Sequence, residues 1–395
     1  MKTLIKNLQV YTSNQLIETG YLLIENNVIA AVGNMEACPE PDNSCITIDL
    51  SSRYKIIPGF IDLHIHGAGG ADTMDGTENA LDTMSTVLPK EGTTSFLATT
   101  MTTAQSDIER ALQNAASYIN NHREAGKAEV LGVHLEGPFI SPKRIGAQNP
   151  DYVQMPSIDL FRKWQELAGG HIKLVTMAPE QPNGLELVRY LTEEGVVASI
   201  GHSDATYEEV VKSIEAGVNH ATHLFNQMRP LHHREPGVVG AALLHDEIKC
   251  EIIADGIHSR PEMVRLAFNN KGQEGLILIT DAMRAKCLGE GTYDLGGQDV
   301  TVKNGKATLK DGTLAGSILK LKDAARNIQQ FTQCGLDAVI QMASVNPAKQ
   351  LNVYDRKGSI EPGKDADLVI LDEKDDIYMT FCLGRIAYTV QEGSK

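Results

Sequence analysis

The chain has 395 residues, of which 42% are apolar and 22% are charged, and its formal net charge is −15. This length accommodates one large core with a smaller module, and the composition is that of an ordinary globular protein. The negative charge argues against nucleic acid and against an anionic membrane surface as partners. No run is apolar enough for a signal peptide or a membrane span, and the six cysteines include no Cys-x-x-Cys pair. We therefore expect a cytoplasmic protein with reduced thiols.

Both ends of the chain predict short strands separated by turns. Strand-like runs occupy residues 4–7, 21–27, 28–33, 368–372 and 377–390. We expect the N-terminal segment, 1–57, and the C-terminal segment, 355–395, to pair into one small β-sandwich domain.

The middle of the chain, 58–354, alternates apolar runs with segments that are compatible with helices. The predicted strands are 60–66, 94–99, 130–136, 172–177, 196–202, 218–223, 248–255 and 276–281, and the clearest helical segments are 104–125, 185–194, 207–216 and 261–271. This alternation indicates a parallel sheet in an α/β protein, and eight such units predict a (β/α)8 TIM-like barrel. A doubly wound open sheet is the alternative. We expect a β-hairpin insertion near 292–314, followed by helices over 316–334 and 336–344.

The pair His64–Ile65–His66 ends the first apolar run of the predicted barrel. A strand places side chains i and i+2 on the same face, so the two imidazoles can point at one ion. Imidazole nitrogen is a ligand for zinc, iron and other transition metals. The alternative is a pair of structural histidines beside a turn.

Polar residues also follow five other predicted strands. They are His134 and Glu136, His202, His220 and His223, Asp255 and His258, and Asp281. In a (β/α)8 barrel these strand ends form the face that carries active sites, and polar groups there are costly unless they are bonded or coordinated. The pattern therefore favours a metal-dependent enzyme. His134 and His220 also fit hydrogen-bond partners of ligands, and Asp281 fits either a helix N-cap or a general base.

Longer strings around these residues carry a family resemblance. They are His-Leu-Glu-Gly-Pro-Phe (134–139), Thr-His-Leu-Phe-Asn-Gln-Met (222–228), His-Arg-Glu-Pro-Gly (233–237), Ala-Asp-Gly-Ile-His (254–258) and Leu-Ala-Gly-Ser (314–317). With them the chain resembles the amidohydrolase superfamily over nearly its whole length, and within it the branch that deacetylates amino-sugar phosphates.

The resemblance implies a divalent metal, zinc, iron or a similar ion, with one or two ions per chain. The implied ligands are His64, His66, Glu136, His202 and His223. Because no Lys stands at the end of a predicted barrel strand, Glu136 is expected to bridge the two ions in place of the carbamylated Lys of other superfamily members.

The implied reaction is hydrolysis of N-acetyl-D-glucosamine 6-phosphate to D-glucosamine 6-phosphate and acetate by metal-activated water, in amino-sugar catabolism and cell-wall recycling. Asp281 is expected to take the proton of the water and to pass it to the leaving amine. The implied substrate contacts are Ala147, Gln148, Asn226, Gln227, Arg234, His258, Leu314, Ala315 and Gly316. The resemblance also suggests a homodimer in which Arg234 reaches the neighbouring protomer to hold the phosphate.

Two positions depart from the familiar pattern. Gln148 stands where some relatives place a histidine against the acetyl carbonyl, and an amide cannot carry a positive charge. Gln227 and Arg229 stand where smaller residues are familiar, so the finer substrate preference stays open. Two other functions are considered: a superfamily hydrolase of cyclic amides or N-acyl amino acids, which needs no phosphate grip, and an inactive barrel used for assembly, which usually loses its metal ligands.

Overall fold

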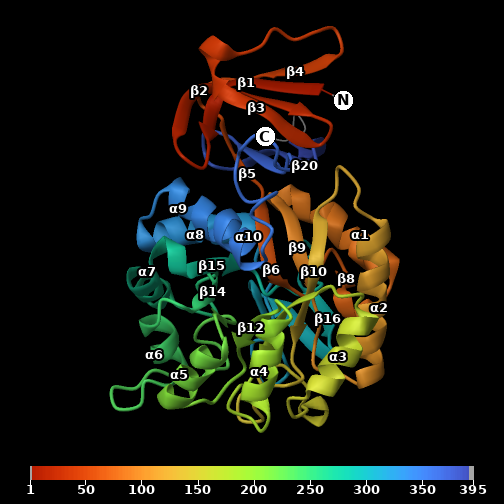
Figure 1. The fold of residues 1–395 in the computed structure, drawn as a ribbon, viewed down its shortest axis with the longest axis vertical. Helices are drawn as coiled ribbons and strands as arrows, with labels where there is room; N and C mark the ends of the chain where they lie inside the picture. Colours follow the sequence, from red (N-terminus) through yellow and green to blue (C-terminus); the bar gives the residue numbers. More distant parts are fainter. Residues whose placement is uncertain (1, 391–395) are drawn as a thin grey trace.

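Two β-sheets dominate the computed structural model, which describes residues 2–390. The smaller domain is built on one eight-stranded sheet that contains strands from both ends of the chain (Figure 1). Its members are β1 (Lys2–Tyr11), β2 (Leu16–Glu25), β3 (Val28–Asn34), β4 (Cys45–Asp49), β5 (Lys55–Pro58), β19 (Leu368–Leu371), β20 (Ile377–Cys382) and β21 (Arg385–Thr389). The pairing of β5 with β1 and β19 joins the two ends. The domain bounds at 57/58 and 354/355 stay a prediction, and residues 1 and 391–395 lie outside the described residues.

The second sheet is a ring of eight parallel strands that follow one another in chain order. They are β6 (Phe60–Ile65), β9 (Thr93–Thr99), β10 (Glu129–Glu136), β11 (Ile172–Met177), β12 (Val197–Ile200), β13 (His220–Ala221), β14 (Lys249–Ile253) and β15 (Leu276–Ile279). A parallel bridge between Ile65 and Ala282, with a 2.9 Å hydrogen bond from His66 N to Ala282 O, links the last strand back to the first. The predicted (β/α)8 barrel is confirmed, and the open sheet is excluded.

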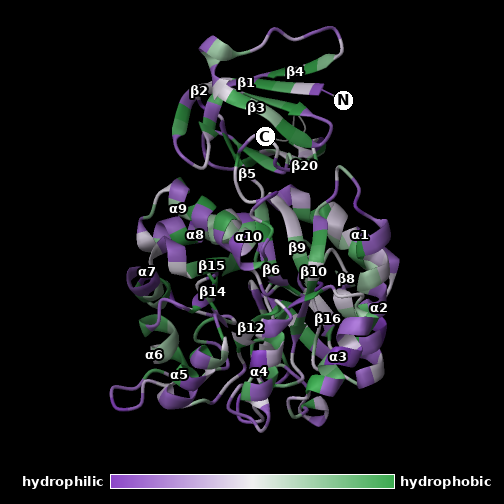
Figure 2. Cartoon of the chain, in the orientation of Figure 1, coloured by the Kyte–Doolittle hydropathy of each residue, from purple (hydrophilic) through white to green (hydrophobic). Residues whose placement is uncertain are grey.

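Helices surround the ring, with hydrophilic surfaces outward (Figures 1 and 2). They are α1 (Glu78–Val87), α2 (Gln105–Asn121), α3 (Ile158–Leu167), α4 (Gly184–Glu193), α5 (Tyr207–Ala216), α6 (Gly237–Leu244), α7 (Pro261–Gly275), α8 (Leu321–Thr332), α9 (Leu336–Ile340) and α10 (Asn346–Gln350). The bounds of α5 agree with the sequence because Thr206 and Glu209 form a reciprocal capping box at its start. The helix expected over 336–344 continues instead as a π-helical turn, Gln341–Val345, that leads into α10. No helix within residues 2–390 is long and apolar enough to cross a membrane.

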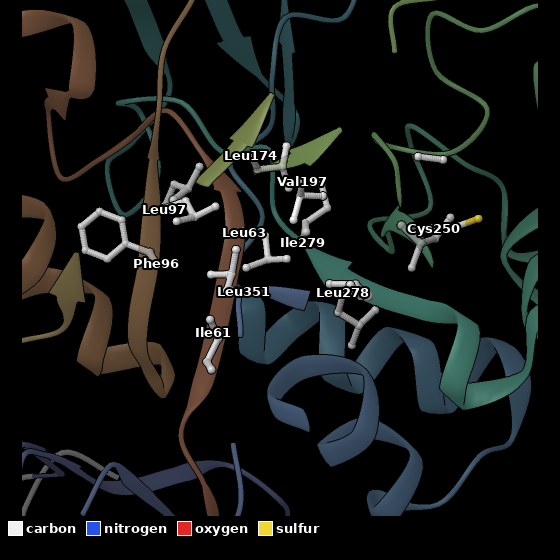
Figure 3. Packing of buried hydrophobic residues seen from close by; sticks show 14 of the residues in the cluster. Ile61, Leu63, Phe96, Leu97, Leu174, Val197, Cys250, Leu278, Ile279 and Leu351 are labelled. Carbon is white, nitrogen blue, oxygen red and sulfur yellow. The ribbon is translucent and has the colours of Figure 1, made fainter. Parts of the chain in front are cut away.

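Strand β6 shows how the sequence builds both the core and the site. Its apolar residues Ile61, Leu63 and Ile65 belong to the main buried cluster, part of which is drawn in Figure 3. The intervening Asp62 and His64 make polar contacts instead. Alternation along one strand therefore places apolar side chains in the core and the polar side chains on the opposite face.

The connection after β15, where a β-hairpin insertion is expected near 292–314, forms three strands. They are β16 (Gly291–Leu295), β17 (Gln298–Lys303) and β18 (Lys306–Thr308). Their apolar side chains pack on Met101 and Met283. A further small hairpin, β7 (Gly67–Ala68) with β8 (Ala71–Asp72), follows β6. Because β5 leads through Gly59 into β6, the small domain adjoins the amino ends of the barrel strands and leaves the carboxyl ends free.

Candidate active site

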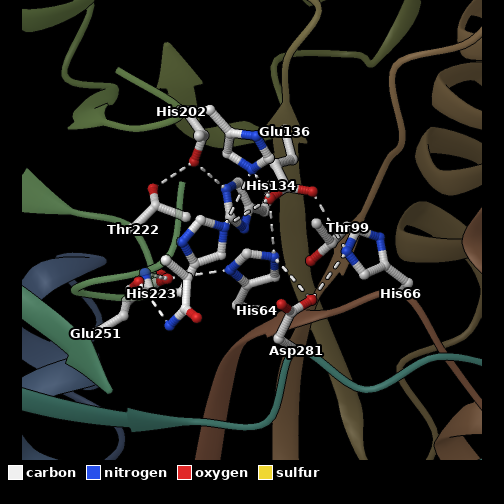
Figure 4. Close-up of polar contacts among 12 residues, drawn as sticks. His64, His66, Thr99, His134, Glu136, His202, Thr222, His223, Glu251 and Asp281 are labelled. Atoms are coloured by element: carbon white, nitrogen blue, oxygen red, sulfur yellow. Dashed lines mark hydrogen bonds and ion pairs between the residues drawn. The ribbon is translucent and has the colours of Figure 1, made fainter. Parts of the chain in front are cut away.

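Six side chains converge at the carboxyl ends of the barrel strands (Figure 4). They are His64 from β6, His66 directly after it, Glu136 from β10, His202 after β12, His223 after β13 and Asp281 after β15. The sequence analysis names all six, although up to 217 residues separate them along the chain. The barrel brings their ligand atoms together because parallel strands end on the same face.

Glu136 lies at the centre of this group. Its Oε1 is 3.3 Å from His202 Nε2 and 3.2 Å from His223 Nε2. The same oxygen is 3.5 Å from His64 Nε2. Its Oε2 is 3.3 Å from His66 Nε2. One carboxylate thus faces four imidazoles, three through Oε1 and one through Oε2.

Gly137 allows Glu136 to occupy this position. Gly137 has φ +70°, and a Cβ there would lie 2.2 Å from Thr102 Oγ1. A residue with a side chain would therefore meet both a disfavoured backbone conformation and a clash. The Glu-Gly step is a local requirement that the sequence displays directly.

The outer nitrogens of two histidines are held by acceptors. His64 Nδ1 donates to Glu251 Oε2 at 3.0 Å. His202 Nδ1 donates to the carbonyls of Arg144, at 2.9 Å, and Ile145, at 3.1 Å. With the proton on Nδ1, each neutral imidazole presents the lone pair of Nε2 to the centre, which is the arrangement a metal ligand needs.

Glu251 is the residue that sequence reasoning missed. It is fully buried on β14, and its Oε2 also accepts a 3.0 Å hydrogen bond from the backbone N of His223. Its Oε1 lies 3.1 Å from His220 Nε2. The available signal was a single acidic residue inside the otherwise apolar strand Lys249–Ile253. Such a carboxylate requires partners, and here they are the side chains of His64 and His220 and the backbone N of His223.

His134 belongs to the surroundings of the centre. Its Nε2 lies 2.7 Å from Thr176 Oγ1. Burial, reinforced by the nearby charge of His64, lowers the pKa of His134 to about 3. His134 is therefore a neutral hydrogen-bonding residue at neutral pH.

The donors fit a divalent metal ion. Two groups, His64 with His66 and Asp281, and Glu136 with His202 and His223, each have ligand atoms within 4.8 Å of one another. Within residues 2–390 the buried His64 Nε2 has no hydrogen-bond partner. Imidazole nitrogen and carboxylate oxygen are ligands of zinc and of iron. The arrangement is thus a candidate site for one or two ions.

Protons and metal ions compete for these donors. Burial disfavours a charged His66, but its hydrogen bonds to Asp281 and Glu136 outweigh burial and raise its pKa to about 9. Burial likewise opposes the charge on Glu136, but the His64 charge and the hydrogen bonds from His202 and His223 hold its pKa well below the usual value. Binding of a divalent ion therefore releases protons, as it does wherever histidines must be neutral to coordinate.

Backbone strain concentrates around the same face. Four residues without glycine's freedom have positive φ: His223 (31°), Phe225 (80°), Gln227 (50°) and Asp281 (49°). Such conformations cost on the order of 1–3 kcal/mol each and persist where the surroundings fix them. Asp281 is fixed by its backbone N, which donates to His64 O at 2.8 Å. Its Oδ1 lies 3.2 Å from His66 Nε2.

A cavity of ≈ 200 Å³ opens above the centre. Its lining includes the centre's His66, Glu136, His202, His223 and Asp281, and the predicted contacts Ala147, Gln148, Asn226, Gln227, His258, Leu314 and Gly316. Met101 and Leu295, which the sequence analysis did not name, line it as well. Ala315 is buried beneath the cavity surface and Arg234 is exposed on a loop, so neither belongs to the lining in the described chain.

Gln148 and His258 are held in defined orientations at this cavity. The Gln148 amide donates to Glu136 Oε2 at 2.7 Å and accepts from Thr102 N at 2.7 Å. His258 Nδ1 lies 2.6 Å from Asp255 Oδ2. Burial opposes protonation of His258, but the hydrogen bond to Asp255 outweighs it and raises its pKa. The contact with Asp255 thereby favours protonation of His258.

Comparison with known proteins places this geometry in context. A model of the Amidohydrolase family matches residues 56–387. The N-acetylglucosamine-6-phosphate deacetylase of Bacillus subtilis (strain 168) is 49% identical over 393 residues, with 99% of this chain and 98% of the relative covered. The N-acetylgalactosamine-6-phosphate deacetylase of Escherichia coli O157:H7 is 33% identical over 387 residues, with 98% of this chain and 100% of the relative covered.

Solved structures agree with these relatives. A mutant N-acetyl-D-glucosamine-6-phosphate deacetylase from Mycobacterium smegmatis, in complex with N-acetyl-D-glucosamine-6-phosphate, matches with a TM-score of 0.91 at 30% identity, over 98% of this chain and 100% of that chain. The N-acetylglucosamine-6-phosphate deacetylase from Thermotoga maritima matches with a TM-score of 0.88 at 36% identity and the same coverage.

Proposed function

The chain belongs to the amidohydrolase family, and on that premise we infer that it hydrolyses N-acetyl-D-glucosamine 6-phosphate to D-glucosamine 6-phosphate and acetate. The observation that carries this inference is the bridging position of Glu136 between four imidazoles, with Asp281 beside them at the cavity. A relative that is 49% identical over 99% of the chain supports the same substrate.

We assign His64, His66, Glu136, His202 and His223 as ligands of a divalent metal, with Glu136 shared between two ions. When bound, the ion lowers the pKa of a coordinated water from about 15.7 towards about 7 and polarises the substrate carbonyl. The chain's own contribution is to fix the donors: Glu251 orients His64, and the carbonyls of Arg144 and Ile145 orient His202.

Asp281 acts as general base and then as general acid. Its carboxylate lines the cavity and lies 3.2 Å from His66. It takes the proton of the attacking water and transfers it to the nitrogen of the acetamide, because an amine leaves readily only after protonation. The centre lowers the pKa of Asp281, against the effect of burial, through the charge of His64 and the hydrogen bond from His66. The carboxylate form of Asp281 is therefore favoured in the metal-free centre.

The sugar phosphate occupies the cavity above the centre. Asn226, Gln227 and His258 lie on its wall, where their side chains can donate hydrogen bonds to an anionic substrate. Gln148 already donates to Glu136, so its amide holds the bridging carboxylate instead of supplying charge to the carbonyl. Polarisation of the acetyl carbonyl would therefore be supplied by a bound metal ion.

Arg234 is assigned to the phosphate of a neighbouring protomer. It is exposed on the loop between β13 and α6, where its Nη1 lies 2.7 Å from His233 Nε2, and it is absent from the cavity lining of its own described chain. A planar guanidinium suits two-point binding of phosphate. These facts support a homodimer that completes each site in trans. We place the reaction in the cytoplasm, because the six cysteines are free.

Acetate release from N-acetylglucosamine 6-phosphate tests this function. We expect rapid release from the 6-phosphate and slow release from unphosphorylated N-acetylglucosamine. N-acetylgalactosamine 6-phosphate is tested as well, because one relative is named as a deacetylase of that epimer. Release from N-acyl amino acids or cyclic amides at a rate equal to that from the 6-phosphate would contradict the proposal.

Metal analysis of the double variant His64→Ala/His66→Ala tests the two-ion assignment. We expect two ions per wild-type chain and one per variant chain, because Glu136, His202 and His223 remain. One ion in both proteins would contradict a binuclear centre.

Mixed dimers test the trans role of Arg234. Removal of one charged hydrogen-bonding partner should lower kcat/KM on the 6-phosphate by about 10- to 150-fold. When Arg234→Ala chains are mixed with Asp281→Asn chains, activity returns in part if Arg234 acts across the interface, since one site then carries both lesions and the other carries none. Activity that stays low in every mixture would assign Arg234 to its own site.

A further inference from the structure

Asp204, two residues beyond His202, receives two guanidinium groups from two different loops. Arg144 donates to its Oδ1 through Nε at 2.8 Å and through Nη2 at 2.6 Å. Arg229 donates to its Oδ2 through Nη2 at 3.0 Å and to its backbone carbonyl through Nε at 2.7 Å. The side chain of Asp204 is 12% exposed, so solvent screens these contacts little.

The two guanidinium contacts of Asp204 are called its two arms, and the first arm, through Arg144, connects Asp204 to the metal centre. The carbonyl of Arg144 accepts the Nδ1 proton of His202, while the guanidinium of the same residue binds Asp204. Arg144 thus contacts both ends of the segment 202–204: its carbonyl binds His202 and its guanidinium binds Asp204. Loss of the guanidinium contact would free the segment that fixes the imidazole.

The second arm leads to the substrate wall. Arg229 follows Asn226 and Gln227, which line the cavity. Its backbone N donates to Ser203 O at 2.9 Å, and Ser203 N donates to Gln227 O at 3.1 Å. This pairing and the Arg229 side chain attach the wall to the segment that carries Asp204.

The two arms also touch each other. A Cβ on Gly146 would lie 2.7 Å from Cγ of Gln227, so the loop after Arg144 packs closely on the substrate wall. From the other side, Glu180 Oε1 accepts the backbone N of Asp204 at 2.8 Å, and Glu180 Oε2 accepts Ser203 Oγ at 2.8 Å. The position of Asp204 is therefore set independently of either arginine.

We propose that Asp204 is a positioning residue that holds the metal ligand His202 through Arg144 and the substrate wall at Asn226–Gln227 through Arg229. The inference rests on the proposed function for its substrate arm and on the donor geometry alone for its metal arm. The proposal explains why a large residue, Arg229, stands at this position: a long side chain with two donor groups is needed to reach from the substrate wall to Asp204.

The Arg144 and Arg229 contacts predict different effects for two variants that each remove one guanidinium. Arg144→Met should weaken Co²⁺ binding to the metal-free protein by roughly 10- to 100-fold, the usual cost of losing a residue that orients a ligand, with a smaller change in KM. Arg229→Met should raise KM for the 6-phosphate by roughly 2- to 30-fold and leave Co²⁺ affinity at the wild-type value. Asp204→Asn should show both effects.

Lys143→Met is the matched control. Lys143 Nζ lies 3.6 Å from the same Asp204 oxygen that Arg229 contacts, but its side chain is 77% exposed. It should change neither Co²⁺ affinity nor KM. Equal shifts of both quantities in Arg144→Met and Arg229→Met, or an effect of Lys143→Met as large as theirs, would overturn the proposal.

Two further measurements keep the test decisive. If Arg144→Met does not fold, Arg144→Lys replaces it, since a lysine keeps the charge without the two-point contact, and unchanged Co²⁺ affinity there would refute the metal arm. If the wild-type protein binds Co²⁺ but releases no acetate, the proposed function fails while the Co²⁺ titrations still decide the metal arm.

Discussion

Two buried clusters of carboxylates lie at opposite ends of the barrel and satisfy their charge in different ways. At the carboxyl ends of the strands, Glu136 and Asp281 face imidazoles whose Nε2 atoms point inward. At the amino ends, Glu129, Asp365 and Asp367 surround one ammonium group, that of Lys357. Both clusters bring at least three potential ligand atoms within metal-binding distance of one another.

The difference lies in whether the chain supplies its own cation. Lys357 is 1% exposed and ion-pairs with all three carboxylates, and Arg356 adds a two-point contact with Glu129. This second cluster, here called the base cluster, is complete without a metal and links the barrel to the small domain. At the carboxyl ends the partners are imidazoles, which can lose their protons and offer nitrogen lone pairs to an ion, and within the described residues the buried His64 Nε2 has no hydrogen-bond partner, so this cluster fits an added ion. Proximity of acidic groups alone therefore does not identify a metal site.

The largest contrast is expected from Asp281→Asn. It should lower kcat by about 10²–10⁴-fold, because the amide cannot accept a proton, while metal content and unfolding free energy change little. Asp151→Asn, an exposed aspartate on the loop after Gln148, serves as control. Loss of one metal ion in Asp281→Asn would make this residue a ligand and remove its role as base.

Lys357→Met should have the opposite profile. Removal of one partner of a buried ion pair typically costs about 3–5 kcal/mol in unfolding free energy, and three carboxylates are uncovered here. The kinetics of the molecules that stay folded should be unchanged. Lys127→Met removes a half-exposed pair with Asp82 and should cost under about 1 kcal/mol. Similar losses for both variants, measured by denaturant unfolding, would show that the base cluster contributes no special stability.

The base cluster also predicts an acid-sensitive stability. Burial opposes the charge of Glu129, but Lys357 and Arg356 outweigh it and lower its pKa to about 2, from a usual 4.5. Because the folded pKa is depressed, the stabilisation is present above pH 4.5 and is lost as pH falls towards 2, at a cost of up to about 3 kcal/mol. With both proteins chelated, wild type and Glu129→Gln should converge in unfolding free energy across that range. Parallel curves would refute the assignment.

The smallest effect is expected from metal addition, which distinguishes the two carboxylate clusters directly. Because the ion binds the folded centre, unfolding free energy should rise by about 2.7 kcal/mol at an ion concentration 100-fold above Kd. The increment should be the same in Lys357→Met, since the two clusters share no residue, and should disappear in the fivefold variant His64→Ala/His66→Ala/Glu136→Gln/His202→Ala/His223→Ala. An increment that depends on Lys357 would place an ion in the base cluster.

Local patterns predicted the parts of the molecule that depend on neighbouring residues. The alternation in β6 is legible in sequence because a strand turns every second side chain to one face. The bounds of α5 could be predicted because Thr206 and Glu209, which form its capping box, are only three residues apart. The pairing of the strands within the insertion and the π-helical turn after α9 could not be, since pairing and hydrogen bonding there depend on the surfaces that these segments pack against.

By itself the sequence determined the barrel, the strand ends and the donors that stand on them, because each follows from residue type and short-range periodicity. Only the tertiary structure decided which distant groups serve those donors. His64 meets Glu251 across 187 residues, Gln148 turns its amide to Glu136, and Asp204 joins loops that carry Arg144 and Arg229. Likewise, only the tertiary structure shows that Arg234 lies outside the cavity lining of its own described chain. Such contacts require closure of the whole ring, because no local rule fixes the distance between residues on different strands.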